Sequence, residues 1–148
     1  MTITGSCRCE QITFEIKSPP AMTTACHCVG CQKMSSSAFS LTALFPAESF
    51  AITQGEPVIG GLRGPTRHYF CPSCLTWLFT RPEGVETFVG VRSSLLENPQ
   101  LYPPFMETWT AEKLPWVTTA AAFSYEAFPD PSEFPQLMER FQAVDKRN

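Results

Sequence analysis

The chain has 148 residues, with 11 Lys and Arg against 14 Asp and Glu, which gives a net charge of −3. This acidic balance excludes the usual basic nucleic-acid-binding proteins, because contacts to phosphates need clustered Lys and Arg. No stretch approaches the roughly 18 apolar residues of a membrane-spanning helix, and the N-terminus lacks the charged start and apolar core of a signal peptide. We therefore expect a single domain over residues 1–148, located in the cytoplasm, without nucleic acid or membrane as a partner.

The predicted elements are mainly short strands, separated by turns rich in Pro and Gly. Alternating apolar and polar residues, as in Ile12, Phe14 and Ile16, are typical of a half-buried strand. The predicted strands cover residues 12–16, 50–52, 68–70, 77–79 and 85–91. The strands 68–70 and 77–79 are expected to flank a knuckle that holds a metal ion at its tip.

Helices are predicted at only two places. Residues 35–45 fit a short helix, and residues 132–144 fit a longer one. In the second segment Phe134, Leu137 and Phe141 fall at helical spacing, and Ser132 with Glu133 suits a helix start. Residues 117–123 are apolar and fit a buried strand or a helix equally. The predicted fold class is mainly β, with few short helices.

The seven cysteines form the most informative pattern of the sequence. An odd number cannot pair fully into disulfides, and a reducing cytoplasm disfavours structural disulfides. None of the cysteines stands alone, whereas buried structural cysteines are usually scattered singly. Close clusters of thiols favour metal binding. The cysteines are Cys7, Cys9, Cys26, Cys28, Cys31, Cys71 and Cys74.

Two of the cysteine pairs together predict one closed metal site. Cys71 and Cys74 form a C-x-x-C knuckle, whose two-residue gap lets both sulfurs reach one ion. Cys7 and Cys9 are the natural other half, because alternate residues of a strand point to the same face. Four cysteines complete the tetrahedron of a structural zinc ion. A redox-active C-x-x-C is the alternative, but no βαβ pattern surrounds it.

The remaining three cysteines predict a different kind of site. Cys26, Cys28 and Cys31 fall within six residues, and Gly30 permits a tight loop. Three protein ligands leave one position of a tetrahedral zinc ion open, as in catalytic zinc sites. His27 is either a fourth ligand, a group that hydrogen-bonds close to the ligands, or an exposed residue that assists proton transfer; we take it as the candidate catalytic residue.

The ordered cysteine motifs resemble those of the glutathione-dependent formaldehyde-activating family. The resemblance rests on Gly5-x-Cys7-x-Cys9, Cys26-His27-Cys28-x-x-Cys31 and Phe70-Cys71-x-x-Cys74, and it extends to Leu114-Pro115-Trp116. The chain departs from the family pattern at Gln32 and Lys33, at Ser36, at Leu75, and near Met106-Glu107, where a histidine is common.

The resemblance implies a small domain of coiled antiparallel sheets with two zinc ions. It implies that Cys7, Cys9, Cys71 and Cys74 hold a structural zinc, and that Cys26, Cys28 and Cys31 hold the zinc of the active site. The implied activity is that of a carbon–sulfur lyase, which adds the thiol of glutathione to formaldehyde or a similar small aldehyde. Two alternatives are a zinc module that binds glutathione or another thiol without turnover, and a structural zinc protein with a partner-binding surface.

Overall fold

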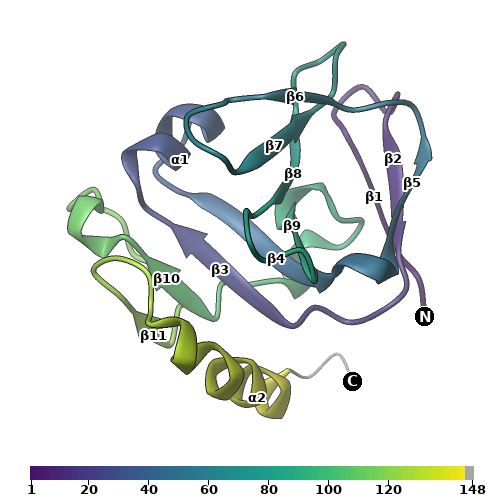
Figure 1. Ribbon diagram of the computed structural model, residues 1–148. Helices are drawn as coiled ribbons and strands as arrows, with labels where there is room; N and C mark the ends of the chain where they lie inside the picture. The colour runs from purple at the N-terminus through teal and green to yellow at the C-terminus, as the bar shows by residue number, and fades with distance from the viewer. Residues whose placement is uncertain (146–148) are drawn as a thin grey trace.

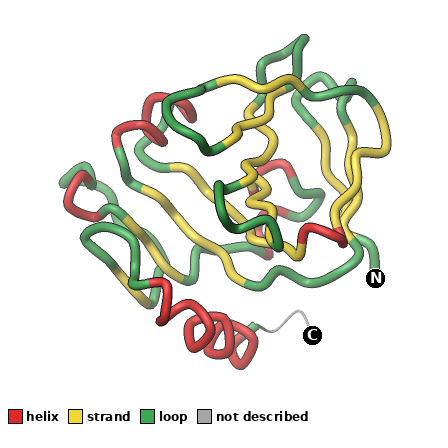
Figure 2. Tube along the Cα trace, viewed as in Figure 1, coloured by secondary structure: helices red, strands yellow, loops and turns green. Residues whose placement is uncertain are grey.

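Two β-sheets account for most of the chain, and the computed structural model describes residues 1–145 (Figures 1 and 2). The first sheet has three strands in the order β1-β2-β5, and neighbouring strands are antiparallel. Its strands are β1 (Ile3–Ser6), β2 (Thr13–Ile16) and β5 (Phe50–Gln54). The strands expected around residues 12–16 and 50–52 are therefore confirmed.

The second sheet has eight strands in the order β11-β10-β3-β4-β9-β8-β7-β6. Its strands are β3 (Met22–Cys26), β4 (Ser40–Pro46), β6 (Val58–Gly60), β7 (Arg67–Phe70), β8 (Trp77–Arg81), β9 (Phe88–Arg92), β10 (Met106–Thr108) and β11 (Phe123–Ser124). Most neighbours are antiparallel, but β10 runs parallel to both β3 and β11. The mainly β fold is confirmed, and the parallel pairs are an addition that the sequence did not indicate.

The larger hydrophobic core joins the two sheets. Phe14 of β2 packs in one cluster with Phe45 of β4 and Val91 of β9, and all three side chains are almost completely buried. Ala43, opposite Val91 in the register, belongs to the same cluster. Because side chains alternate along a strand, these residues share one face of the larger sheet, which is apolar along β4 and β9. The opposite face is free to carry polar residues.

A smaller core lies under the C-terminal helix α2 (Phe134–Val144). Leu137 and Phe141 of the helix pack against Met22 of β3 and Met106 of β10. The predicted helix is confirmed, but its start differs. A capping box formed by Asp130 and Glu133 precedes it, so Ser132 is not the capping residue. The helix runs along one edge of the molecule, beside β3 and β11 (Figure 1).

The helix expected over residues 35–45 is wrong. The helix α1 (Val29–Ser35) comes before this segment and ends at Ser36, which has a φ of 50° in the left-handed region. The chain then enters β4, which pairs with β3 on one side and β9 on the other. These pairings and the burial of Phe45 outweigh the local helix propensity of the segment.

Two further expectations are corrected by the backbone hydrogen bonds. The predicted strand 85–91 begins only at Phe88, because the Val85 N–H closes a turn to the Pro82 carbonyl oxygen, at 3.4 Å. Residues 117–123 form neither a buried strand nor a helix. Only Phe123–Ser124 pairs as β11, while Val117 lies in a turn whose N–H bonds to the Leu114 carbonyl.

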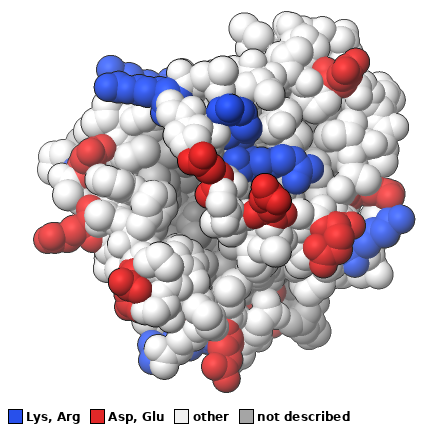
Figure 3. All heavy atoms as spheres, viewed as in Figure 1, with Lys and Arg blue, Asp and Glu red and all other residues white. Residues whose placement is uncertain are grey.

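Among the helices of residues 1–145, none combines the length and apolar character needed to cross a membrane. On the face shown in Figure 3, acidic and basic side chains are interspersed.

Candidate metal centres

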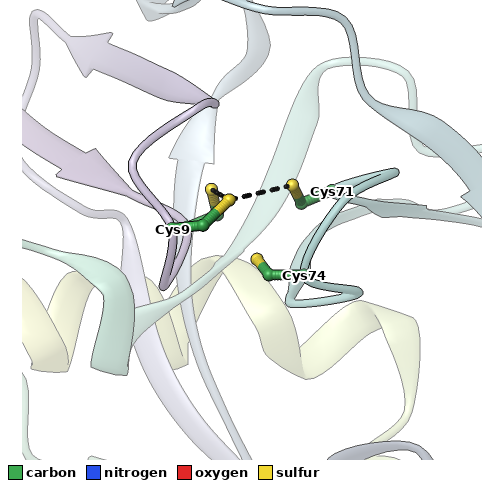
Figure 4. Close-up of side chains that lie close together, drawn as sticks. Cys9, Cys71 and Cys74 are labelled. Carbon is green, nitrogen blue, oxygen red and sulfur yellow. Dashed lines mark hydrogen bonds between the residues drawn. The ribbon is translucent and has the colours of Figure 1, made fainter.

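The first candidate centre joins the N-terminal turn to the knuckle between β7 and β8. Cys7 and Cys9 follow β1, and Cys71 and Cys74 follow β7. The four Sγ atoms lie within 4.8 Å of one another. Figure 4 shows the labelled Cys9, Cys71 and Cys74 pointing toward a common centre from these two segments. The structure therefore brings together the two cysteine pairs, although Cys7 and Cys9 lie in a turn and not on a strand.

Local hydrogen bonds hold both halves of this centre. The Cys7 N–H donates to the Ile12 carbonyl at 3.0 Å, and the Ile12 N–H donates back to Cys7 Sγ at 3.3 Å. In the knuckle, the Leu75 N–H donates to the Cys71 carbonyl at 3.0 Å. Leu75 has a φ of 58°, a left-handed conformation that favours glycine. The turn geometry is thus kept although this chain has Leu at position 75, where chains with the resembling cysteine pattern usually have Gly.

The sulfur spacing fits a tetrahedral zinc ion. Zn–S bonds of about 2.3 Å place the sulfurs of a tetrahedron about 3.8 Å apart. Cys7 and Cys9 Sγ are 3.5 Å apart, and Cys9 and Cys71 Sγ are 3.7 Å apart. All seven cysteines are free thiols, so no disulfide competes for these sulfurs. The hydroxyl of Thr76, 3.1 Å from Cys74 Sγ, lowers the pKa of Cys74 to about 5 and so favours a thiolate.

The second candidate centre lies where β3 ends and α1 begins. Cys26 closes β3, Cys28 precedes α1, and Cys31 is in its first turn. Their three Sγ atoms lie within 4.8 Å of one another, and the group contains no fourth ligand among the described residues. The Cys31 N–H donates to Cys28 Sγ at 3.3 Å, which caps the helix and fixes the Cys28 side chain.

Hydrogen bonds within the three-cysteine cluster shift the pKa values of its thiols. A hydrogen bond from Cys31 lowers the pKa of Cys26 to about 5, and bonds from the backbone of Cys28 and from Thr108 act in the same direction. The same shared proton, together with burial, raises the pKa of Cys31. These hydrogen bonds therefore favour the thiolate form of Cys26. Metal-thiolate bonds would release the remaining protons.

His27 lies among these cysteines but is completely buried. Its Nε2 atom is 2.8 Å from Glu107 Oε2, and its Nδ1 atom has no hydrogen-bond partner among the described residues. The alternative of an exposed His27 is therefore wrong. His27 is also not part of the group of atoms that converge as metal ligands, which speaks against its being a fourth ligand.

Glu107 of β10 organises the surroundings of His27. It accepts hydrogen bonds from Lys113, Thr119 and Ser124 as well as from His27. Burial alone raises the pKa of Glu107, but the bonds from Ser124, His27, Lys113 and Thr119 outweigh it and lower the pKa to about 2. Because the ionised carboxylate only accepts, the hydrogen of His27 lies on Nε2.

Glu107 could not be assigned a role from the sequence. It is 80 residues from His27, and the two meet because β10 pairs in parallel with β3, with Thr108 opposite Cys26. The signal in the sequence was indirect: Glu107 stands close to the place where a histidine is common in similar chains.

Comparisons with known proteins agree with this geometry. The sequence model of the family described as "Glutathione-dependent formaldehyde-activating enzyme" matches residues 2–112. A protein of Halomonas elongata named "Putative glutathione-dependent formaldehyde-activating enzyme" is 31% identical over 132 residues, which cover 79% of this chain and 80% of the relative. A crystal structure of a Rhodobacter sphaeroides protein matches the fold with a TM-score of 0.53 and 18% identity, over 64% of this chain and 87% of that chain. The chain therefore belongs to the glutathione-dependent formaldehyde-activating family.

Proposed function

We propose that the protein reversibly adds the thiol of glutathione to formaldehyde or a similar small aldehyde, with one zinc ion in each cysteine cluster. The observation that carries the proposal is the convergence of three Sγ atoms, from Cys26, Cys28 and Cys31, without a fourth ligand among residues 1–145. Membership of an enzyme family with this substrate pair supports the reaction. In the reverse direction the reaction breaks a carbon–sulfur bond, which makes the protein a carbon–sulfur lyase.

In this proposal the two clusters have different roles, one structural and one in binding the substrate thiol. Cys7, Cys9, Cys71 and Cys74 supply all four ligands of a structural zinc ion. The three-cysteine cluster supplies only three. A zinc ion held there by Cys26, Cys28 and Cys31 would supply a Lewis acid that favours the thiolate form of a substrate thiol near neutral pH.

His27 is proposed to move the proton of the reaction. Its Nε2–H donates to Glu107, which fixes the ring and leaves Nδ1 as an acceptor. Nδ1 accepts the proton of the incoming thiol and returns it to the aldehyde oxygen as the C–S bond forms. The S–H bond breaks, the C–S and O–H bonds form, and the carbonyl becomes an alcohol, so the addition balances without a redox partner.

A second candidate function is the capture of thiols without turnover. The complete burial of His27 favours it, because an acid–base group must reach the reacting atoms. Both candidates place the thiol at the same cluster, so only turnover separates them. A cytoplasmic location is part of either proposal, since glutathione and reduced cysteines coexist there.

The test follows the exchange of 13C-formaldehyde with glutathione by NMR. We expect the protein loaded with two zinc ions to accelerate formation of S-(hydroxymethyl)glutathione over the uncatalysed reaction. Cys28→Ser is expected to abolish the acceleration, whereas Val29→Ala, at an exposed neighbouring position, is expected to keep it. Glutathione binding without any acceleration by the native chain would favour the thiol-capture function instead.

A further inference from the structure

One face of the larger sheet carries a continuous polar strip that starts at the three-cysteine cluster. In the register, Cys26 of β3 lies opposite Ser40 of β4, and Thr42 of β4 lies opposite Arg92 of β9. Residues two apart on a strand share a face, so Cys26, Ser40, Thr42 and Arg92 lie on the same side. The apolar core residues, such as Ala43 and Val91, occupy the other side.

Buried hydrogen-bond donors without partners gather along this strip. They are the Trp77 Nε1–H and the Arg92 Nε–H, in side chains that are 7% and 8% exposed respectively, whereas the Ser40 hydroxyl on the same strip interacts with the Cys31 thiol. Native proteins leave few buried polar atoms unsatisfied, and each such atom calls for a ligand, a water molecule or a function. Two unsatisfied donors on neighbouring strands, on the strip that starts at the three-cysteine cluster, point to an acceptor that arrives with the substrate.

Arg92 is fixed in a defined orientation. Its Cζ lies 3.9 Å from the centroid of the Trp77 ring, and its Nη2 donates to the Gly90 carbonyl at 3.3 Å. A Cβ atom at Gly90 would lie 3.0 Å from Thr42 Cγ2 and 3.6 Å from Arg92 Nη2. Glycine at position 90 therefore avoids a tight contact with Thr42, while the guanidinium lies at van der Waals distance from this position.

Within residues 1–145, no carboxylate pairs with the buried cation of Arg92. The ion pairs found in the described part of the chain involve Lys17, His27 and Lys113, and none involves Arg92. The negative groups that act on Arg92 are the thiols of Cys31 and Cys26. Burial lowers the pKa of Arg92 to about 10 and these thiols oppose the shift, so Arg92 remains charged at neutral pH. An unpaired buried charge is costly unless it has a role.

We propose that Arg92 forms a subsite that binds a carboxylate of the thiol substrate beside the three-cysteine cluster. This inference rests on the proposed function only in placing the substrate sulfur at that cluster. A guanidinium matches a carboxylate through paired N–H donors, and the match strengthens out of water. The subsite makes the protein selective for thiols that carry a carboxylate, of which glutathione is one.

The competing explanation is that Arg92 only offsets the negative charge of the metal-bound thiolates. The two explanations differ in what they predict for the ligand. If Arg92 binds the substrate, its loss weakens the binding of carboxylate-bearing thiols only. If Arg92 offsets the cluster charge, its loss weakens zinc binding and affects every thiol alike.

The test is calorimetric titration of the chain loaded with two zinc ions, with glutathione and with glutathione diethyl ester, in which both carboxylates are neutralised. We expect the native chain to bind glutathione about tenfold to one hundredfold more tightly than the ester, as for a charge-assisted hydrogen-bonded pair. Arg92→Met is expected to remove this preference with the zinc content unchanged. Arg81→Met is the matched control, since Arg81 also lies beside an aromatic ring, that of Phe79, on the adjacent strand; it is expected to keep the preference.

Equal binding of glutathione and its ester by the native chain overturns the inference, and so does a preference that survives Arg92→Met. Loss of zinc in Arg92→Met, measured by elemental analysis, overturns it in favour of charge compensation. If Arg92→Met does not fold, Arg92→Lys keeps the charge and is expected to reduce the preference without loss of zinc; an undiminished preference contradicts the subsite. A carboxylate preference without turnover of formaldehyde leaves the subsite intact and refutes only the proposed reaction.

Discussion

The two cysteine clusters differ in how far apart their members lie along the chain. The four-cysteine cluster joins segments that are far apart in the chain, since Cys9 and Cys71 are separated by 62 residues. The three-cysteine cluster is local, because it spans only the end of β3 and the first turn of α1. A cross-link over a long loop restricts the unfolded chain far more than a link within six residues. We propose that the first cluster serves stability and that the second is available for chemistry.

The largest effect is expected when one ligand of the four-cysteine cluster is removed, which tests its difference from the three-cysteine cluster. We expect Cys71→Ser to destabilise the fold by more than about 3 kcal/mol, because structural zinc sites supply folding energy on the order of 10 kcal/mol. Thermal unfolding by circular dichroism, with zinc analysis of the same sample, measures the effect. Ser73→Ala, in the same knuckle, is the control that removes only a surface hydrogen bond to Gln11. An unfolding temperature within a few degrees of the native value would refute the structural role.

Removing one ligand of the three-cysteine cluster is expected to affect thiol binding and not stability. Cys28→Ser should remove one zinc ion and all thiol binding, while the unfolding temperature stays close to that of the native chain. The reason is that β3 and β4 keep their pairing and their buried face without the metal. Equal destabilisation by Cys28→Ser and Cys71→Ser would erase the distinction between the clusters.

The hydrogen bonds of Glu107 concern the three-cysteine cluster, because Glu107 holds His27, which lies between Cys26 and Cys28. Its folded-state pKa of about 2 is below the ordinary value of 4.5, so it contributes stability above pH 4.5 that is lost as the pH falls toward 2. We expect Glu107→Gln to cost about 3 kcal/mol at pH 7 and less than half of that at pH 3. Urea unfolding at both pH values measures the difference. A cost that does not depend on pH would mean that Glu107 acts by packing and not by charge.

The smallest expected effect concerns Leu75, in the knuckle that carries Cys71 and Cys74. Leu75 is 69% exposed and holds a φ of 58°, so its side chain gains little from burial while its backbone is strained. Leu75→Gly is expected to stabilise the protein by about 1 kcal/mol. Leu62→Gly, at another exposed leucine, serves as the control and is expected not to stabilise it. Chemical unfolding of the three proteins compares them, and a destabilised Leu75→Gly would show that the Leu75 side chain contributes to the knuckle.

The sequence predicted those parts of the molecule that depend on short-range patterns. Alternation located the strands that carry Phe14 and Phe50, and the spacing of Leu137 and Phe141 located α2. Local propensity failed where pairing on both sides decided the outcome, as in β4, which was expected to be helical. Glu107 and Arg92 were missed because they reach the cluster through strand register, and register is not visible in the spacing of residues along the chain.

The central claim, that one cluster is closed and the other accepts a thiol, is tested most directly by zinc X-ray absorption. The chain would be loaded with two zinc ions and measured without and with glutathione. The account predicts that glutathione raises the average number of sulfur ligands per zinc ion, and that Cys28→Ser, left with the closed site alone, shows four sulfurs that glutathione does not change. A native spectrum that is the same with and without glutathione would contradict it.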